Sequence, residues 1–338
     1  MLYATTRSKT DTYTAHRTLF EDRAPDGGFF VPFRLANVDI QSLKDRTFSD
    51  AVAEILNIFF STGITAWDID CCIGKAPAKV VFMPHRVLFV NLWNNPIGDY
   101  SYLCDKIYEK LCGNRCGSIT NWANIAIWIS VLFGVYALLG KMGIDQFDLT
   151  VNVGDFSVPM AAWYAKKMGL PIGTVICACN DNSAAWDFIH RGELNTAVLQ
   201  IKTPTPELDY ANPPGLERLI YEFFGLDEVK KYLETSSRKR VYQIRPDMVR
   251  TMGQGMFVAV VGHNRIASVI SSVYSANNYI LDSYAAICYG GLQDYRAKTG
   301  ESCSTVLLTQ RNPSLDLSLV KEATGLTKSD IEKIMNQL

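Results

Sequence analysis

The sequence predicts an α/β fold in which a mostly parallel sheet is flanked by helices, with a smaller α+β segment in front of it. First, from about residue 89 onward, apolar runs of strand length alternate with segments of helical periodicity. Second, "FDLTVNVGDFSVPMAAWYAKKMGLPIGTVICACN", residues 147–180, reads as strand, turn, helix and strand, the βαβ unit that joins parallel strands. Third, 48% of the 338 residues are hydrophobic, which is enough for a sizeable core.

Residues 1–88 read as a mixed segment. "APDGGFFVP" predicts a turn that leads into a short strand. "TFSDAVAEILNIFFSTG" has apolar residues at helical spacing, with Thr47 and Asp50 as an N-terminal cap and Gly63 as the end of the helix. "AKVVFM" and "VLFVNLW" are typical of strands.

The alternation of strands and helices then continues to the C-terminus. Helices are predicted at "DYSYLCDKIYEKLCG", 121–139, "NSAAWDFIHRG", "LERLIYEFFGLDEVKKYLE" and "RIASVISSVYSANN". Besides the two strands of the βαβ unit, strands are predicted at "TAVLQI" and "STVLLTQ". Residues 314–338 are expected to form a tail with a helix capped by Ser329 and Glu332.

The uncharged stretch from Cys116 to Gly140 approaches the length of a membrane span. Polar residues at Asn121, Asn124 and Ser130 interrupt it, and the βα pattern resumes directly after it, which favours a helix buried in the core. The first residues, "MLYATTRSKTDTY", lack the apolar centre of a secretory signal. We therefore expect a cytoplasmic protein without a membrane partner.

Composition argues against two further classes of function. The 33 Lys and Arg are matched by 34 Asp and Glu, so no basic excess favours nucleic acid as a partner. The nine cysteines are scattered without paired CxxC clusters or nearby histidines, and no metal site is predicted. Cys112 and Cys116 bracket "GNR" and could pair, but reduced thiols are expected in a cytosolic protein.

A run of fragments, in this order, resembles the threonine synthase family. These fragments are "APDGGFFVP", "TFSDAVAEI", "TNWANIAIW", "AAWYAKKMGLPI", "CNDN", "LERLIYEF", "YILDSYAA" and "TVLLTQRNP". The resemblance implies a pyridoxal-phosphate enzyme of fold type II, which converts O-phosphohomoserine and water to threonine and phosphate through a Schiff base to a lysine. It also implies a threonine-synthase-type N-terminal domain at 1–88 and the large domain at 89–313.

The resemblance places a serine where the family has its Schiff-base lysine. The family carries this lysine in a Phe-Lys-Asp-Phe run shortly after a His-Gly-Pro-Thr turn. Here "NLWNNPIGDYSYL" places Asn94 and Asn95 on that turn and Ser101 on the lysine. A serine forms no Schiff base, and Lys106, five residues on, falls on a different helix face.

The resemblance also implies a degenerate cofactor site. The family's Gly-Asn-Phe-Gly phosphate loop falls on Gly154, Asp155, Phe156 and Ser157, after Asn152. A turn at a helix N-terminus can bind phosphate, but a carboxylate beside a dianion repels it by several kcal/mol, on the order of the Coulomb energy at intermediate dielectric. The partner of the pyridine nitrogen falls on Thr309 or Gln310, and Tyr284 stands where the family has a histidine.

A domain is also missing by comparison with the family. About a hundred residues of the family, including the Ser-Gly-Asp-Thr-Gly loop that clamps the substrate, are replaced near 111–118 by "EKLCGNRCGSI". We therefore predict a threonine-synthase-like pseudoenzyme without pyridoxal phosphate, with a binding or regulatory role, as a homodimer or beside a paralogous enzyme subunit.

Two alternatives stay open. One is an enzyme with different chemistry, in which Asn94, Asn95, Asp99, Tyr100, Ser101, Asn152, Asp155 and Ser157 converge near the carboxyl ends of the strands. Asp99 or Asp155 would be the base and Ser101 the nucleophile, although no histidine lies in these motifs to activate the serine. The other is an active threonine synthase.

Overall fold

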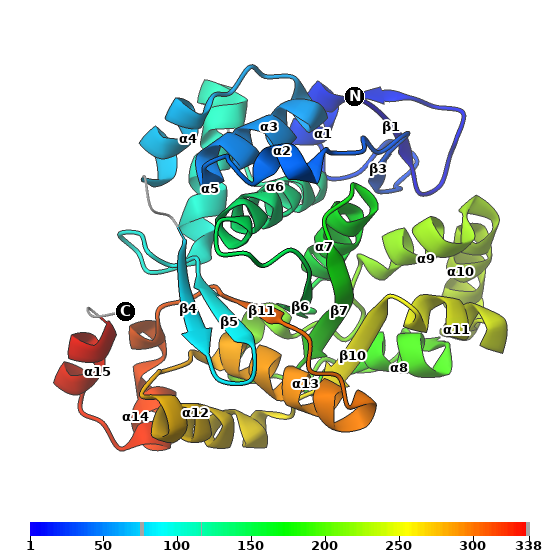
Figure 1. Cartoon of the computed structure of the whole chain (residues 1–338). Helices are drawn as coiled ribbons and strands as arrows, with labels where there is room; N and C mark the ends of the chain where they lie inside the picture. The colour runs from blue at the N-terminus through cyan, green and yellow to red at the C-terminus, as the bar shows by residue number, and fades with distance from the viewer. Residues whose placement is uncertain (75–77, 116, 336–338) are drawn as a thin grey trace.

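A computed structural model describes residues 1–74, 78–115 and 117–335 (Figure 1). Its strands are β1 (Leu2–Thr5), β2 (Tyr13–Thr14), β3 (Phe30–Pro32), β4 (Lys79–Met83), β5 (Val87–Asn91), β6 (Phe147–Asn152), β7 (Ile172–Cys179), β8 (Glu193–Asn195), β9 (Val241–Gln243), β10 (Met256–Val260) and β11 (Thr305–Thr309). Its α-helices are α1 (Ala15–Phe20), α2 (Ile40–Leu43), α3 (Phe48–Phe60), α4 (Ala66–Ile73), α5 (Tyr100–Cys112), α6 (Asn121–Gly140), α7 (Ser157–Lys167), α8 (Ala184–Arg191), α9 (Leu216–Phe224), α10 (Leu226–Lys239), α11 (Pro246–Gly253), α12 (His263–Asn277), α13 (Ser283–Thr299), α14 (Leu317–Thr324) and α15 (Lys328–Met335).

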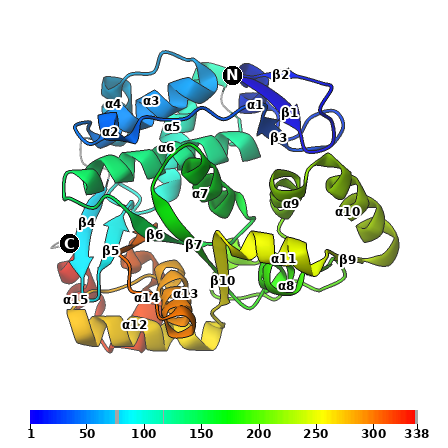
Figure 2. The same ribbon diagram turned by 45° about the vertical axis from the view of Figure 1, so that its right-hand side comes forward.

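The centre of the molecule is a six-stranded sheet in the order β10-β7-β6-β11-β5-β4. Neighbouring strands pair parallel except β4, which pairs antiparallel with β5 at one edge. Helices α6 and α7 lie on one side of the sheet and α12 and α13 on the other, as Figures 1 and 2 show. The predicted mostly parallel sheet flanked by helices is therefore confirmed, because burial on both faces suits its continuous apolar strands.

The predicted βαβ unit forms as β6, α7 and β7. Strands β6 and β7 pair parallel, with Thr150 opposite Ile176. All six residues of β6 are buried, and α7 packs on both strands. The unit brings the turn at 153–156 to the carboxyl edge of the sheet, where open α/β sheets bind ligands.

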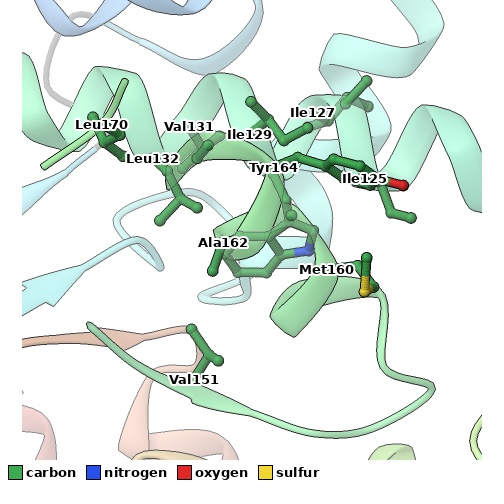
Figure 3. Packing of buried hydrophobic residues seen from close by; sticks show 14 of the residues in the cluster. Ile125, Ile127, Ile129, Val131, Leu132, Val151, Met160, Ala162, Tyr164 and Leu170 are labelled. Carbon is green, nitrogen blue, oxygen red and sulfur yellow. The ribbon is translucent and has the colours of Figure 1, made fainter. Parts of the chain in front are cut away.

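Helix α6 is the buried core helix that the sequence favours. In the described part of the chain it alone is long and apolar enough to span a membrane, and 83% of its most apolar window is buried inside the fold. Figure 3 shows Ile129 and Leu132 of this helix near Ala162 and Tyr164 of α7, with Val151 of β6 on the far side of α7. Protein surrounds α6 on nearly all sides. The helix therefore has apolar residues around most of its circumference and almost no polar face.

The N-terminal segment forms a three-stranded antiparallel sheet, β2-β1-β3, beside helices α1 to α4. The capping box of α3 is present, with Thr47 and Asp50 each accepting from the other's backbone N–H. The helix ends at Phe60, with Ser61 as its C-cap in the left-handed conformation at φ 53°, before Gly63. Strands β4 and β5 join the central sheet, so the sheet begins at Lys79, before the expected boundary at 88.

Two expectations about the second half of the chain are wrong. "TAVLQI" is not a strand, because pairing with β9 ends at Asn195, whose side chain accepts from the Ala197 N–H and turns the chain. Leu199 is left 86% exposed. The long amphipathic helix breaks at Gly225, which has φ 81° between α9 and α10.

The C-terminal helix α15 begins two residues earlier than the sequence suggested. Its cap is Thr327 with Asp330, which exchange hydrogen bonds of 2.6–3.3 Å, and not Ser329 with Glu332. Cys116, half of the cysteine pair considered above, lies outside the described residues.

Candidate functional site

A cleft of about 630 Å³ opens at the carboxyl ends of the parallel strands. Its walls come from the segments after β6 and β11, the N-terminal turns of α5 and α6, and the loop before α9. The lining residues are Asp22, Arg23, Phe29, Asp99, Tyr100, Ser101, Cys104, Asp105, Ile119, Thr120, Asn121, Asn124, Trp128, Asn152, Val153, Gly154, Asp155, Val158, Glu207, Leu208, Tyr210, Pro214, Tyr284, Gln310 and Arg311. This volume is typical of a small-molecule site.

The cleft gathers most of the residues that the sequence singles out. Lining it are Asp99, Tyr100, Ser101, Asn152, Gly154, Asp155, Tyr284 and Gln310. Asn94 and Asn95 do not join them, and instead line a separate cavity of about 350 Å³ beside Lys79 and Asn91. Phe156, Ser157 and Thr309 are buried behind the wall and do not line the cleft.

Asp155 closes the turn before α7 with its own carboxylate. Its Oδ1 accepts from the Ser157 backbone N–H at 2.8 Å, and its Oδ2 accepts from the Ser157 hydroxyl at 2.7 Å. The turn is tight, with Gly154 at φ 47° and Phe156 at φ 74°. A side-chain anion therefore already uses the first N–H of the helix, the kind of group that binds phosphate in such turns.

A buried arginine supports this turn from behind, and sequence reasoning missed it. Arg218 of α9 is 0% exposed and donates to Asn121 Oδ1 at 2.6 Å and to the Phe30 carbonyl at 3.1 Å. Asn121 in turn donates to the Ser157 hydroxyl at 3.0 Å. Burial lowers the pKa of Arg218. The sequence does hint at this buried arginine, because Arg218 is a charged residue within the amphipathic run "LERLIYEF".

Arg311, which follows β11, was also missed and lies in the cleft itself. It donates to Asp99 Oδ2 at 2.9 Å and to Glu207 Oε1 at 3.0 Å. Its guanidinium lies 4.7 Å from the centre of the Tyr284 ring. The Arg311 guanidinium thus lies between two carboxylates and over an aromatic face. Carboxylates and aromatic faces both attract cations.

The neighbourhood of Ser101 does not supply an activated nucleophile. Asp99 caps α5, because its Oδ1 accepts from the Ser101 backbone N–H at 2.8 Å, and its Oδ2 is paired with Arg311. Asp155 is similarly engaged with Ser157. No histidine is among the described lining residues, so the serine hydroxyl has no base beside it there.

No lysine is among the described lining residues either. Lys106 lies on the outer face of α5, where its Nζ pairs with Glu109 Oε2 at 2.7 Å and lies 5.7 Å from the centre of the Tyr102 ring. The hydrogen bond with Glu109 raises the pKa of Lys106, which keeps this amine charged. An amine must be neutral to attack an aldehyde.

Thr309 and Gln310, at the end of β11, lie on opposite sides of the chain. Thr309 points away from the cleft, donating to Asn91 Oδ1 at 2.7 Å and accepting from Trp93 Nε1 at 3.2 Å. Gln310 lines the cleft. Successive residues of a strand face opposite sides, so only one of the two can reach a ligand there.

A buried carboxyl group lies behind the wall at Tyr284. Asp282 is 1% exposed and caps α13, with Oδ1 accepting from the Tyr284 and Ala285 backbone N–H groups at 2.9 and 3.0 Å. Its Oδ2 has no hydrogen-bond partner among the described residues. Burial raises the pKa of Asp282 to about 8.

Sequence comparisons place the N-terminal part with a known family. The family profile described as "Threonine synthase N terminus" matches residues 2–76. "Threonine synthase-like 1" of Homo sapiens is 28% identical over 177 residues, which cover 49% of this chain and 23% of that protein. Threonine synthase of Schizosaccharomyces pombe is 22% identical over 190 residues, 49% of this chain and 37% of that protein. The chain thus spans well under half the length of these curated relatives.

Structural comparison covers nearly the whole chain. A crystal structure of pyridoxal-phosphate-bound threonine synthase from Brucella melitensis matches with a TM-score of 0.85 and 18% identity, over 99% of this chain and 94% of that chain. At this identity the likeness establishes a shared fold, that of the fold type II pyridoxal-phosphate enzymes.

Proposed function

We propose that the chain is a catalytically silent member of the threonine synthase family, which forms no Schiff base with pyridoxal phosphate and acts by binding. The observation that carries this proposal is the lining of the cleft, where no lysine is found among the described residues. Without an amine in reach, the aldehyde of the cofactor has no group to condense with.

The residues present do not fit the cofactor at its phosphate end either. In the turn before α7, the Asp155 carboxylate takes the hydrogen bond of the Ser157 N–H. A phosphate dianion would have to displace this carboxylate and then lie beside its charge. Like charges about 4 Å apart repel by roughly 4 kcal/mol at intermediate dielectric.

The proposed role is binding or regulation through the same cleft and its surroundings. Around the cleft, the described chain has the parallel sheet, the buried helix α6 and the capped helices. A chain that was losing its structure would not keep a continuous buried hydrophobic core. We propose that the small domain of the family is replaced by a short stretch near residues 111–118, which leaves the cleft open to a partner or ligand.

The test is whether the purified protein can be loaded with pyridoxal phosphate. Incubation with the cofactor, borohydride reduction and intact-mass measurement are expected to leave the mass unchanged. An active threonine synthase treated in parallel is the control, and should gain one reduced cofactor. A mass gain that peptide mapping assigns to any single lysine would overturn the proposal.

Genetic complementation gives an independent test. Expression in a bacterial strain that lacks threonine synthase is expected to leave the strain dependent on threonine, with the soluble protein confirmed by immunoblot. Growth without threonine would contradict the silent role.

A further inference from the structure

The charged groups of the cleft have an unusual balance for a protein related to phosphate-binding enzymes. Five carboxylates line it, from Asp22, Asp99, Asp105, Asp155 and Glu207. The described lining has only two cationic side chains, Arg23 and Arg311. The formal excess is therefore three negative charges, gathered in one concave site.

Ion pairing within the chain uses only part of this charge. Arg311 is shared between Asp99 and Glu207. In the described chain, none of Asp22, Asp105 and Asp155 forms an ion pair within 4 Å. Arg218 lies behind Asn121 and offsets part of the charge of Asp155, but it is fully buried and does not reach the cleft.

The second feature is an aromatic lining. Phe29, Tyr100, Trp128, Tyr210 and Tyr284 all contribute to the wall. Tyr100 stacks on Trp128 with ring centres 3.9 Å apart. Aromatic faces attract organic cations and are indifferent or unfavourable to phosphate.

An unpartnered polar group marks the same wall. Tyr284 is 7% exposed, and its hydroxyl has no hydrogen-bond partner among the described residues. A buried hydroxyl without a hydrogen-bond partner is destabilising, so such a group is typical of a site completed by a ligand or by water. Its ring already receives the Arg311 guanidinium, at 4.7 Å.

From these observations we infer that the cleft binds a small organic cation, an ammonium or guanidinium group on a short apolar stem. Asp22 and Asp105 supply the free negative charge, and the aromatic wall packs against the stem. The inference rests on the proposed function, because a cofactor held by its phosphate would need the opposite charge in the same cleft. The volume of about 630 Å³ suits a small molecule.

The test is isothermal titration calorimetry of the whole chain at low ionic strength with agmatine and putrescine, and with inorganic phosphate and pyridoxal phosphate as anionic counterparts. The amines are expected to bind, the phosphates not to bind, and added salt to weaken the amines. In Asp22→Asn with Asp105→Asn, amine affinity should fall by about fivefold for each charge removed. The amide at 22 keeps the acceptor for the Asn121 N–H, which lies 2.9 Å from Asp22 Oδ1.

The matched control is Asp45→Asn, because Asp45 is exposed between α2 and α3 and lies outside the cleft. Its amine affinity should equal that of the unaltered protein. Absence of amine binding, phosphate binding tighter than amine binding, or equal losses in the control and the double variant would each overturn the inference. A pyridoxal adduct trapped by borohydride would overturn the silent role instead, so the two failures are distinguishable.

Discussion

Gly215, at the start of α9, lies directly against the backbone of Asp155 in the turn before α7. The Gly215 N–H donates to the Asp155 carbonyl at 2.9 Å, and a Cβ added at Gly215 would come within 2.7 Å of that oxygen and 2.9 Å of the Phe156 Cβ. The Asp155 carbonyl and the Phe156 Cβ, which such a Cβ would contact, belong to a tight turn with two residues at positive φ. The two segments therefore fix each other's position at the wall of the cleft.

Gly215→Ala is expected to destabilise the protein by about 1–3 kcal/mol, because the backbone atoms in contact cannot move aside as a flexible side chain would. Urea unfolding followed by circular dichroism measures this change. Gly253→Ala is the matched control, since no atom lies within 4 Å of a Cβ at Gly253 in α11. The control should be neutral or up to about 1 kcal/mol more stable. Equal midpoints for the two variants would contradict the close contact.

Asp155→Ala should lower the free energy of unfolding by about 1 kcal/mol, the usual loss when a helix N-terminus loses its side-chain acceptor. Asp155→Asn keeps an oxygen for the Ser157 N–H and should lose less. Comparison of the two variants by urea unfolding separates the hydrogen bond from the charge. If both variants match the unaltered protein, the carboxylate does not hold the turn.

Much of the fold and part of the site follow from local pattern. The βαβ unit at 147–180 is visible because apolar strands, a turn and a helix end occur in one short stretch. The carboxyl ends of parallel strands meet at one edge, so Asn152 and Gln310 could be expected to share a cleft. The capping box of Thr47 and Asp50 is likewise contained in four residues.

The rest depends on contacts that no local pattern contains. Arg311 and Asp99 are 212 residues apart in sequence, and Arg218 and Asn121 are 97 apart. "TAVLQI" has the composition of a strand but no neighbour to pair with after Asn195, and an unpaired strand is not stable. The aromatic residues of the cleft wall, such as Trp128, occur in the sequence at apolar helical spacing. From the sequence alone, such residues are assigned to the core.

Arg218→Met is expected to destabilise the protein by about 3 kcal/mol or more. The substitution leaves the Phe30 carbonyl and the Asn121 amide without their donor, and the guanidinium stacked 4.8 Å from the Phe29 ring is lost. Thermal and urea unfolding measure the loss. Arg250→Met is the control, because Arg250 is exposed and forms no ion pair in the described chain. A small effect at 218 would show that the N-terminal sheet docks without this arginine.

Titration of Asp282 should contribute to the pH dependence of the free energy of unfolding. Burial raises its pKa to about 8, whereas the unfolded chain has a pKa near the ordinary value of roughly 3.9. Between about pH 4 and 8 the folded state therefore keeps a proton that the unfolded state has released. The contribution of Asp282 to stability therefore falls as pH rises through this window, by at most about 1.4 kcal/mol per pH unit.

Asp282→Asn removes this titration but keeps an oxygen for the Tyr284 and Ala285 N–H groups. The difference in unfolding free energy between pH 5 and pH 8 should therefore be smaller in the variant than in the unaltered protein. Asp330→Asn is the matched control, a capping aspartate whose pKa is lowered by its hydrogen bond with Thr327. Asp330 is ionised in both states across this range, so its variant should keep the original slope. Identical slopes in all three proteins would mean that Asp282 is charged in the folded state, with a partner that its geometry does not provide.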